Sequence, residues 1–189
     1  MLVARHLLMI FVLAFCLAGC SLPRIIILND PLDARQHNDL GVAYQQRGEP
    51  DLALREYERA ARLEPQWARP WINSGNVLAE QEQWRQAAKS YRQALRREAG
   101  NDEAMNNLAW VLLKAEKPQE ALAWVDKAVA ANPNEPAYHD TLAEIRIALH
   151  DYAGARQAVT EALVLDPSEE LRHTLEQKLA LLDHLTPQP

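Results

Sequence analysis

Residues 34–67 read ARQHNDLGVAYQQRGEPDLALREYERAARLEPQW, and the same pattern of residue types returns three more times along the chain. In blocks of 34 residues the chain divides without a gap into 34–67, 68–101, 102–135 and 136–169. Block positions 8, 20 and 27 hold only Gly or Ala: Gly41, Gly75, Ala109, Ala143, Ala53, Ala87, Ala121, Ala155, Ala60, Ala94, Ala128 and Ala162. A fixed period of this length indicates stacked units, because one unit cannot bury its apolar face alone.

Each block predicts two helices of about thirteen residues joined by a short turn. The small residues fit places where two helix axes cross closely, since bulk there would push the helices apart. Turn signals lie at 47–50 and 116–118, where a proline opens the next helix and its missing N–H costs nothing. Pro65, Pro133 and Pro167 then end the second helix of a block.

Two blocks carry a recognisable signature at the start of their first helix. Leu40 and Gly41 are followed by Tyr44, and Trp71 precedes Gly75, as in the pattern W-x2-L-G-x2-Y followed by A, an aromatic, A and P. The chain from 34 to 169 therefore resembles the tetratricopeptide repeat. The resemblance implies an all-α fold, a right-handed superhelical solenoid of four helix-turn-helix repeats.

The stretch after the fourth block predicts one further helix. Leucines recur there at helical spacing, at Leu171, Leu175, Leu179 and Leu182. We expect residues 170–189 to form a C-terminal capping helix and a tail, since an open end of a solenoid needs a cover with a polar outer face.

The N-terminus, MLVARHLLMIFVLAFCLAGC at 1–20, reads as an export signal. Its apolar run at 7–17 is of signal-peptide length and short for a bilayer span. The run ends in LAGC, which resembles the lipobox of bacterial lipoproteins. The resemblance implies that residues 1–19 are a signal peptide, removed in the mature chain, and that Cys20 becomes lipidated.

Residues 20–33 would then tether the lipidated cysteine to the first repeat. Ser21 stands where an Asp retains many Gram-negative lipoproteins in the inner membrane, so the expected location is the outer membrane, facing the periplasm. A short transmembrane helix, or an ordinary signal peptide with a chance cysteine, remains the alternative interpretation.

The resemblance also implies where a partner would bind, because first helices of such repeats line a concave groove. The candidate groove residues are Asn38, Asp39, Asn73, Asn76, Asn106, Asn107 and Trp110. Asparagine is a poor helix former, so its recurrence within predicted helices needs a reason. Its amide both donates and accepts, and can hold the main chain of an extended peptide, while a tryptophan can anchor it. The alternative is that these positions are solvated and that Trp110 packs between first helices.

Composition and motifs exclude several other classes of protein. The formal net charge is −6 and no long basic run occurs, which disfavours nucleic acid as a partner. Two cysteines make no disulfide framework. No HExxH, GxSxG, P-loop or GxGxxG motif occurs. We therefore expect no catalytic residue, no metal, no cofactor and no small-molecule substrate.

The sequence thus predicts a non-enzyme: a membrane-anchored periplasmic adaptor or scaffold that binds a protein or extended peptide in its groove for cell-envelope assembly. One alternative is a pilotin-like factor for type IV pilus or secretin assembly. A second is an accessory acting in trans on a C39-like cysteine peptidase, because the segments 29–32 and 37–44 look similar to repeats found with such enzymes. A third is a structural spacer without a groove ligand.

Overall fold

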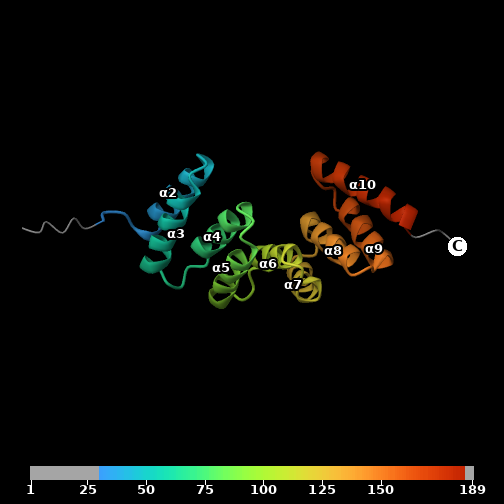
Figure 1. Cartoon of the computed structure of the whole chain (residues 1–189), viewed down its shortest axis with the longest axis horizontal. Helices are drawn as coiled ribbons and strands as arrows, with labels where there is room; N and C mark the ends of the chain where they lie inside the picture. Colours follow the sequence, from blue (N-terminus) through green and yellow to red (C-terminus); the bar gives the residue numbers. More distant parts are fainter. Residues whose placement is uncertain (1–29, 186–189) are drawn as a thin grey trace, which may run out of the picture. The chain divides into compact units, whose positions relative to one another are not determined.

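The structure is a computed structural model that describes residues 30–185. The predicted signal peptide, the lipidation site Cys20, most of the tether and the last four residues lie outside the described part. Within it, the elements are α2 (Ala34–Gln46), α3 (Pro50–Leu63), α4 (Arg69–Glu80), α5 (Trp84–Arg97), α6 (Asp102–Lys114), α7 (Pro118–Ala131), α8 (Pro136–Ala148), α9 (Tyr152–Val164) and α10 (Glu169–Leu185). Between residues 30 and 185 there is no strand, so the all-α prediction is confirmed there (Figure 1).

The helices pack in consecutive pairs, α2 with α3, α4 with α5, α6 with α7 and α8 with α9. Each pair then packs against the next helix in the chain, and α10 packs against α9 (Figure 1). First helices of consecutive repeats also contact one another: α2 contacts α4, α4 contacts α6, and α6 contacts α8. This arrangement is the solenoid that the period predicts, and it places the first helices side by side.

The turn inside each repeat is closed by one residue with a left-handed backbone. The residues are Gly48 with φ of 72°, Glu82 with 58°, Glu116 with 61° and His150 with 63°. They share block position 15, yet only one of them is glycine. A side chain in this region is strained, so three of the four turns are held there by the packing of the helices on both sides.

The core explains why two first helices need glycine at block position 8. A Cβ atom at Gly41 would lie 2.5 Å from Cε1 of Tyr57, and one at Gly75 would lie 2.5 Å from Cε1 of Tyr91. Both rings are buried. The later repeats hold Ala at this position and Val in place of the tyrosine, so a smaller partner leaves room for the extra methyl group.

Helix α10 closes the C-terminal end of this core. Leu175 and Leu182 are fully buried within the same hydrophobic cluster as the helices of repeats 2 to 4. Its outer positions are polar, with Glu170, His173 and Glu176 exposed. An apolar inner face with a polar outer face is what a capping helix requires.

Candidate peptide-binding surface

A row of asparagine side chains links the first helices of the first three repeats. Asn73 Nδ2 of α4 donates to Asn38 Oδ1 of α2 at 2.8 Å. Asn107 Nδ2 of α6 donates to Asn76 Oδ1 of α4 at 3.2 Å. We call Asn38, Asn73, Asn76, Asn106 and Asn107 the asparagine row. The amides tie one repeat to the next, which accounts for asparagine within helices.

Buried tyrosine hydroxyls support this surface from the second helices. Tyr91 Oη donates to Asn76 Oδ1 at 2.7 Å, and Tyr57 Oη donates to Gln45 Oε1 at 2.9 Å. Burial, and then the negative charge of Glu80, raises the pKa of Tyr57 to about 12. Burial likewise raises the pKa of Tyr91. Both hydroxyls therefore stay protonated at neutral pH and remain hydrogen-bond donors.

Four of the predicted groove residues line one pocket of about 300 Å³, whose walls are Asn76, Ala79, Glu80, Tyr91, Asn106, Asn107, Trp110 and Thr141. In it, Asn106 Nδ2 donates to Asn107 Oδ1 over a long 3.4 Å. Asn106 Oδ1 is buried and accepts no hydrogen bond from the described residues. A buried acceptor without a donor is costly, so an N–H group entering this pocket would be stabilised there.

Trp110 forms the aromatic wall of the pocket and is half-buried. Its ring meets Trp84 edge to face, with centroids 5.5 Å apart and planes at 83°. Lys114 Nζ lies 5.3 Å from the Trp110 ring centroid. Trp110 therefore packs against Trp84 of α5 while it also lines the pocket.

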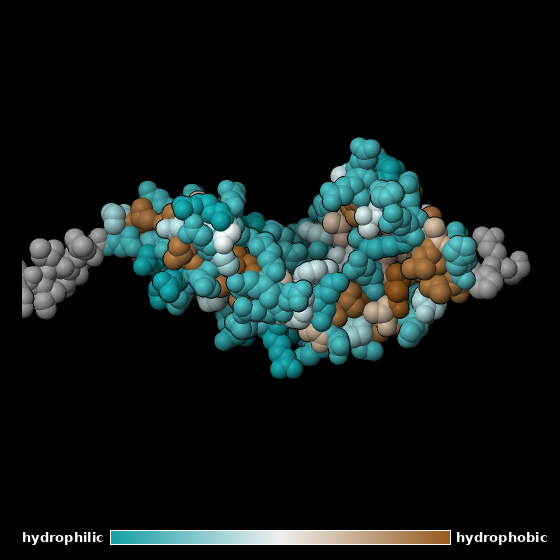
Figure 2. Space-filling model, turned by 45° about the horizontal axis from the view of Figure 1, so that its top comes forward, coloured by the Kyte–Doolittle hydropathy of each residue, from teal (hydrophilic) through white to brown (hydrophobic). Residues whose placement is uncertain are grey.

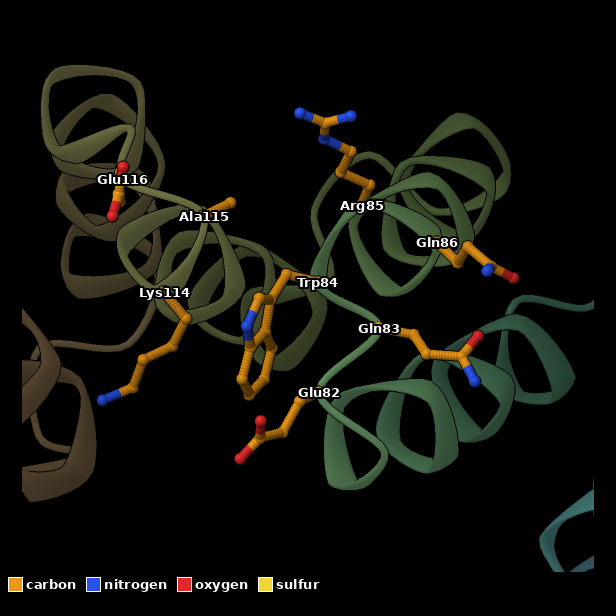
Figure 3. Close-up of a pocket in the computed structure, with 8 residues that line it drawn as sticks. All are labelled: Glu82, Gln83, Trp84, Arg85, Gln86, Lys114, Ala115 and Glu116. Carbon is orange, nitrogen blue, oxygen red and sulfur yellow. The ribbon is translucent and has the colours of Figure 1, made fainter.

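A second pocket, of about 380 Å³, is lined by Trp84 and lies between the α4–α5 turn and the end of α6. Figure 3 shows the Trp84 ring pointing between Lys114 and Glu82, whereas Arg85 and Gln86 point away from the centre. Trp84 is half-buried and lines this second pocket.

The remaining three predicted groove residues, Asn38, Asp39 and Asn73, do not line this pocket. Asn38 is only 6% exposed and its Oδ1 is occupied by Asn73. Asp39 is exposed on α2 and does not line the pocket. Asn38 can therefore act on a ligand only by holding Asn73 in position.

Block position 12 of the first helices becomes steadily more apolar along the chain. The residues in order are Gln45, Ala79, Leu113, Ile147 and, in α10, Leu181. Leu113 and Ile147 are half-buried and Leu181 is 53% exposed. Figure 2 shows the largest hydrophobic surface in that view over α8–α10. The polar asparagine row thus gives way to apolar surface toward the C-terminus.

Lys178 is a residue of this surface that sequence reasoning missed. Its Nζ donates to Asp140 Oδ1 at 2.5 Å and to Glu144 Oε1 at 2.8 Å, and its side chain is only 17% exposed. Burial alone would lower the pKa of Lys178, but the hydrogen bonds to Asp140 and then Glu144 outweigh it and raise the pKa. Continuing the period beyond residue 169 puts Lys178 at block position 9, which could have revealed it.

Residues 30–185 contain neither a metal-binding cluster nor a helix able to cross a membrane. No group of three or more His, Cys, Asp or Glu among them could hold a metal ion. Their helices are also too short or too polar for any of them to cross a membrane.

Comparisons with known proteins agree with this geometry. The tetratricopeptide-repeat family matches residues 34–67 and 72–136. A curated relative, the type IV pilus assembly protein PilF of Pseudomonas aeruginosa, is 32% identical over 135 residues, which cover 68% of this chain and 52% of PilF. The chain thus spans about half the length of that relative.

Two solved structures share the fold. MamA from Desulfovibrio magneticus RS-1 has a TM-score of 0.72 at 24% identity, over 80% of this chain and 84% of MamA. The structure of Pseudomonas aeruginosa PilF has a TM-score of 0.69 at 24% identity, over 85% of this chain and 79% of that structure. The repeated helix pairs, the small residues at their crossings and these matches together show that the chain belongs to the tetratricopeptide-repeat family.

Proposed function

We propose that this chain is a membrane-anchored adaptor that holds an extended segment of a partner protein along the asparagine row. The observation that carries the proposal is the buried, unpaired Oδ1 of Asn106 next to Trp110. A backbone N–H of the partner would satisfy that oxygen. A protein scaffold with such a surface needs no catalytic group, and we propose that the chain is not an enzyme.

The hydrogen-bonding capacity left in the row favours main-chain recognition. Asn76 Oδ1 already accepts from Tyr91 and Asn107. The amide nitrogens of Asn73 and Asn106 each carry two N–H groups and donate one hydrogen bond. These free donors suit backbone carbonyls. Leu113 and Ile147 then offer apolar surface to side chains of the same segment beyond the row. Such a partner would be read by its extended backbone and a few apolar side chains.

The likeness to PilF supports a place for this adaptor in type IV pilus assembly. We propose that Cys20 carries a lipid anchor and that the repeats face the periplasm from the outer membrane. Two or more acyl chains on the cysteine would hold the protein stably, since a single chain binds a membrane only marginally.

The binding surface is tested by Asn106→Ala, compared with Asn134→Ala on the exposed loop between α7 and α8. Because Asn106 makes only one long hydrogen bond, its replacement should leave the unfolding free energy within about 0.5 kcal/mol of the wild type. Crosslinking in native envelopes followed by affinity capture should recover roughly tenfold less partner with Asn106→Ala. Equal recovery from both variants contradicts the proposed site.

The anchor and the pathway are tested by Cys20→Ser and by deleting the gene. Cys20→Ser should move the protein from the membrane fraction to the soluble periplasmic fraction, and the deletion should reduce surface pili in a shearing assay. Tight membrane association of Cys20→Ser would refute the lipid anchor. Unchanged piliation in the deletion strain would refute the pathway while leaving the binding surface standing.

A further inference from the structure

Helix α5 is strongly basic in a chain that is acidic as a whole. The chain has 20 Lys and Arg against 26 Asp and Glu. Helix α5 alone, WRQAAKSYRQALRR, holds five of the cations and no acidic residue. Such a local reversal of charge on one helix sets it apart from the rest of the surface.

Four of these cations form one stripe, which we call the outer basic face: Arg85, Lys89, Arg92 and Arg96. Their spacing of four, three and four residues puts them along one side of the helix. The side chains that α5 buries, such as Ala87 and Ala94, lie on the opposite side. The outer basic face therefore points away from the core.

Most of the charge on this face is not neutralised within the fold. Arg92 pairs with Glu120 of α7 at 2.5 Å. Arg85, Lys89 and Arg96 are exposed, and none of them forms an ion pair with an acidic residue in the described part of the chain. Three uncompensated cations on one helix face create a local positive potential.

The other second helices carry no matching stripe of uncompensated cations. In α3, Arg55 and Arg62 stand at the block positions of Lys89 and Arg96, but Asp51 and Glu58 stand at those of Arg85 and Arg92, and Arg62 pairs with Glu58 at 3.1 Å. The same positions hold Ala123 and Ala130 in α7 and Gln157 and Val164 in α9. The uncompensated positive surface thus belongs to α5 of the second repeat.

We propose that the outer basic face docks on anionic phospholipid headgroups of the membrane to which the chain is anchored. The inference rests on the proposed membrane location. Cys20 and Ala34 are 14 residues apart, which limits their separation to roughly 50 Å, so the first two repeats stay near the bilayer surface. A basic surface tethered within reach of the bilayer gains from each negative headgroup it contacts, since the attraction acts only over about a Debye length.

The composition of the face favours lipid over an acidic protein. Between its cations stand Gln86 and Gln93, and it carries no exposed aromatic or large apolar side chain. Protein interfaces draw most of their affinity from such anchors, whereas headgroup attraction needs only charge. Docking through this face would leave the first-helix surface, with the asparagine row, free for a partner.

Sedimentation with vesicles tests the proposal, using the unlipidated chain from Ser21 onward, which contains every described helix. The vesicles hold phosphatidylethanolamine with or without about 25% phosphatidylglycerol. We expect binding only to the anionic vesicles and its loss between about 50 and 300 mM NaCl. Lys89→Gln with Arg96→Gln should weaken binding at least about tenfold, since each cation near the surface contributes roughly fivefold.

The matched control is Lys117→Gln with Lys127→Gln, which removes the same charge from the third repeat and should bind like the wild type. Equal helicity of all variants by circular dichroism shows that folding is unaffected. Equal binding to neutral and anionic vesicles, or equal losses in both double variants, would overturn the proposal. The proposal would also be overturned if Lys89→Gln with Arg96→Gln still bound anionic vesicles like the wild type but no longer captured an acidic protein that the wild type captures. Every variant in this experiment retains Asn106 and lacks Cys20. A negative result here therefore does not bear on the peptide-binding proposal.

Discussion

The first two repeats and the last two fill the same helix crossing with different pairs of side chains. Gly faces Tyr in the first two, at Gly41 with Tyr57 and at Gly75 with Tyr91. Repeats 3 and 4 carry Ala and Val at those positions. Both choices give a fully packed core, because the volume lost on one helix is gained on the other.

The Gly–Tyr and Ala–Val pairs differ in how they support the candidate binding surface. In the first half, the tyrosine hydroxyls reach through the repeat and hold Gln45 and Asn76 on the first-helix side. Valine offers no such group. In the last repeat, Lys178 of α10 holds Asp140 and Glu144 instead. One end of the surface is thus ordered by neutral hydrogen bonds from inside, and the other by ion pairs from the capping helix.

The largest expected effect comes from replacing the Gly–Tyr pair of repeat 2 with the Ala–Val pair of the later repeats. Tyr91→Val should cost about 3 kcal/mol of unfolding free energy through the cavity it leaves. Gly75→Ala should cost about 2 kcal/mol, because its Cβ would collide with the ring. The double variant recreates the Ala and Val pair and should lose at least about 1 kcal/mol less than the sum in urea unfolding.

Gly100→Ala is the control for this exchange, since a Cβ there meets no atom within 4 Å. We expect its effect to stay within about 0.5 kcal/mol. If the two changes in repeat 2 simply add, the size of Tyr91 is not what requires Gly75.

The next largest loss of stability should come from removing Lys178, the cation that α10 places beside Asp140 and Glu144. Lys178→Met leaves Asp140 and Glu144 without their partner and should cost about 2 kcal/mol. Arg172→Met breaks the exposed pair that α10 makes with Asp166, in the connection before this helix, and should cost less than about 0.5 kcal/mol. Thermal unfolding of both variants measures the difference. Similar losses would show that α10 is held by its leucines alone.

The intra-repeat turns should respond in opposite directions. Glu116→Gly relieves a positive φ of 61° and should stabilise the chain by about 0.5–1 kcal/mol. Gly48→Ala, at a φ of 72°, should destabilise it by about 1 kcal/mol. Urea denaturation of the two single variants tests this. The same sign for both would mean that the backbone of the two turns differs in solution.

The smallest expected effect is at alkaline pH. The pKa of Tyr57 lies near 12 in the folded chain, above its ordinary value of 10.0, so its neutral form is favoured by folding. The corresponding stability is complete below pH 10 and is lost as the pH rises toward 12. Tyr57→Phe should therefore show a shallower fall in melting temperature between these pH values. An unchanged slope would place the tyrosine ring in contact with water.

Much of this architecture follows from periodicity. The small residues at positions 8, 20 and 27 predict where helices cross, and the prolines predict several boundaries. The capping helix follows from its leucines, although it begins at Glu169, one residue before the expected start. Glu82, Glu116 and His150 could not be foreseen as left-handed residues, because packing imposes that backbone on side chains that do not prefer it.

The binding surface was only partly accessible to sequence reasoning. The asparagines could be named because a poor helix former recurs at equivalent positions. The unpaired oxygen of Asn106 and the contact of Trp84 with Trp110 depend on rotamers and on how neighbouring repeats stack. Lys178 was missed because its partners, Asp140 and Glu144, lie one repeat earlier in the chain.

By itself, the sequence determined the repeat length, the all-α class and the choice of small residues at helix crossings, because these depend on local periodicity and side-chain volume. The tertiary structure alone decided which amides already hold each other and which buried oxygen has no donor among the described residues. It also decided that α5 turns its cations outward. Those outcomes arise from distances between residues about one repeat apart, which no local pattern contains.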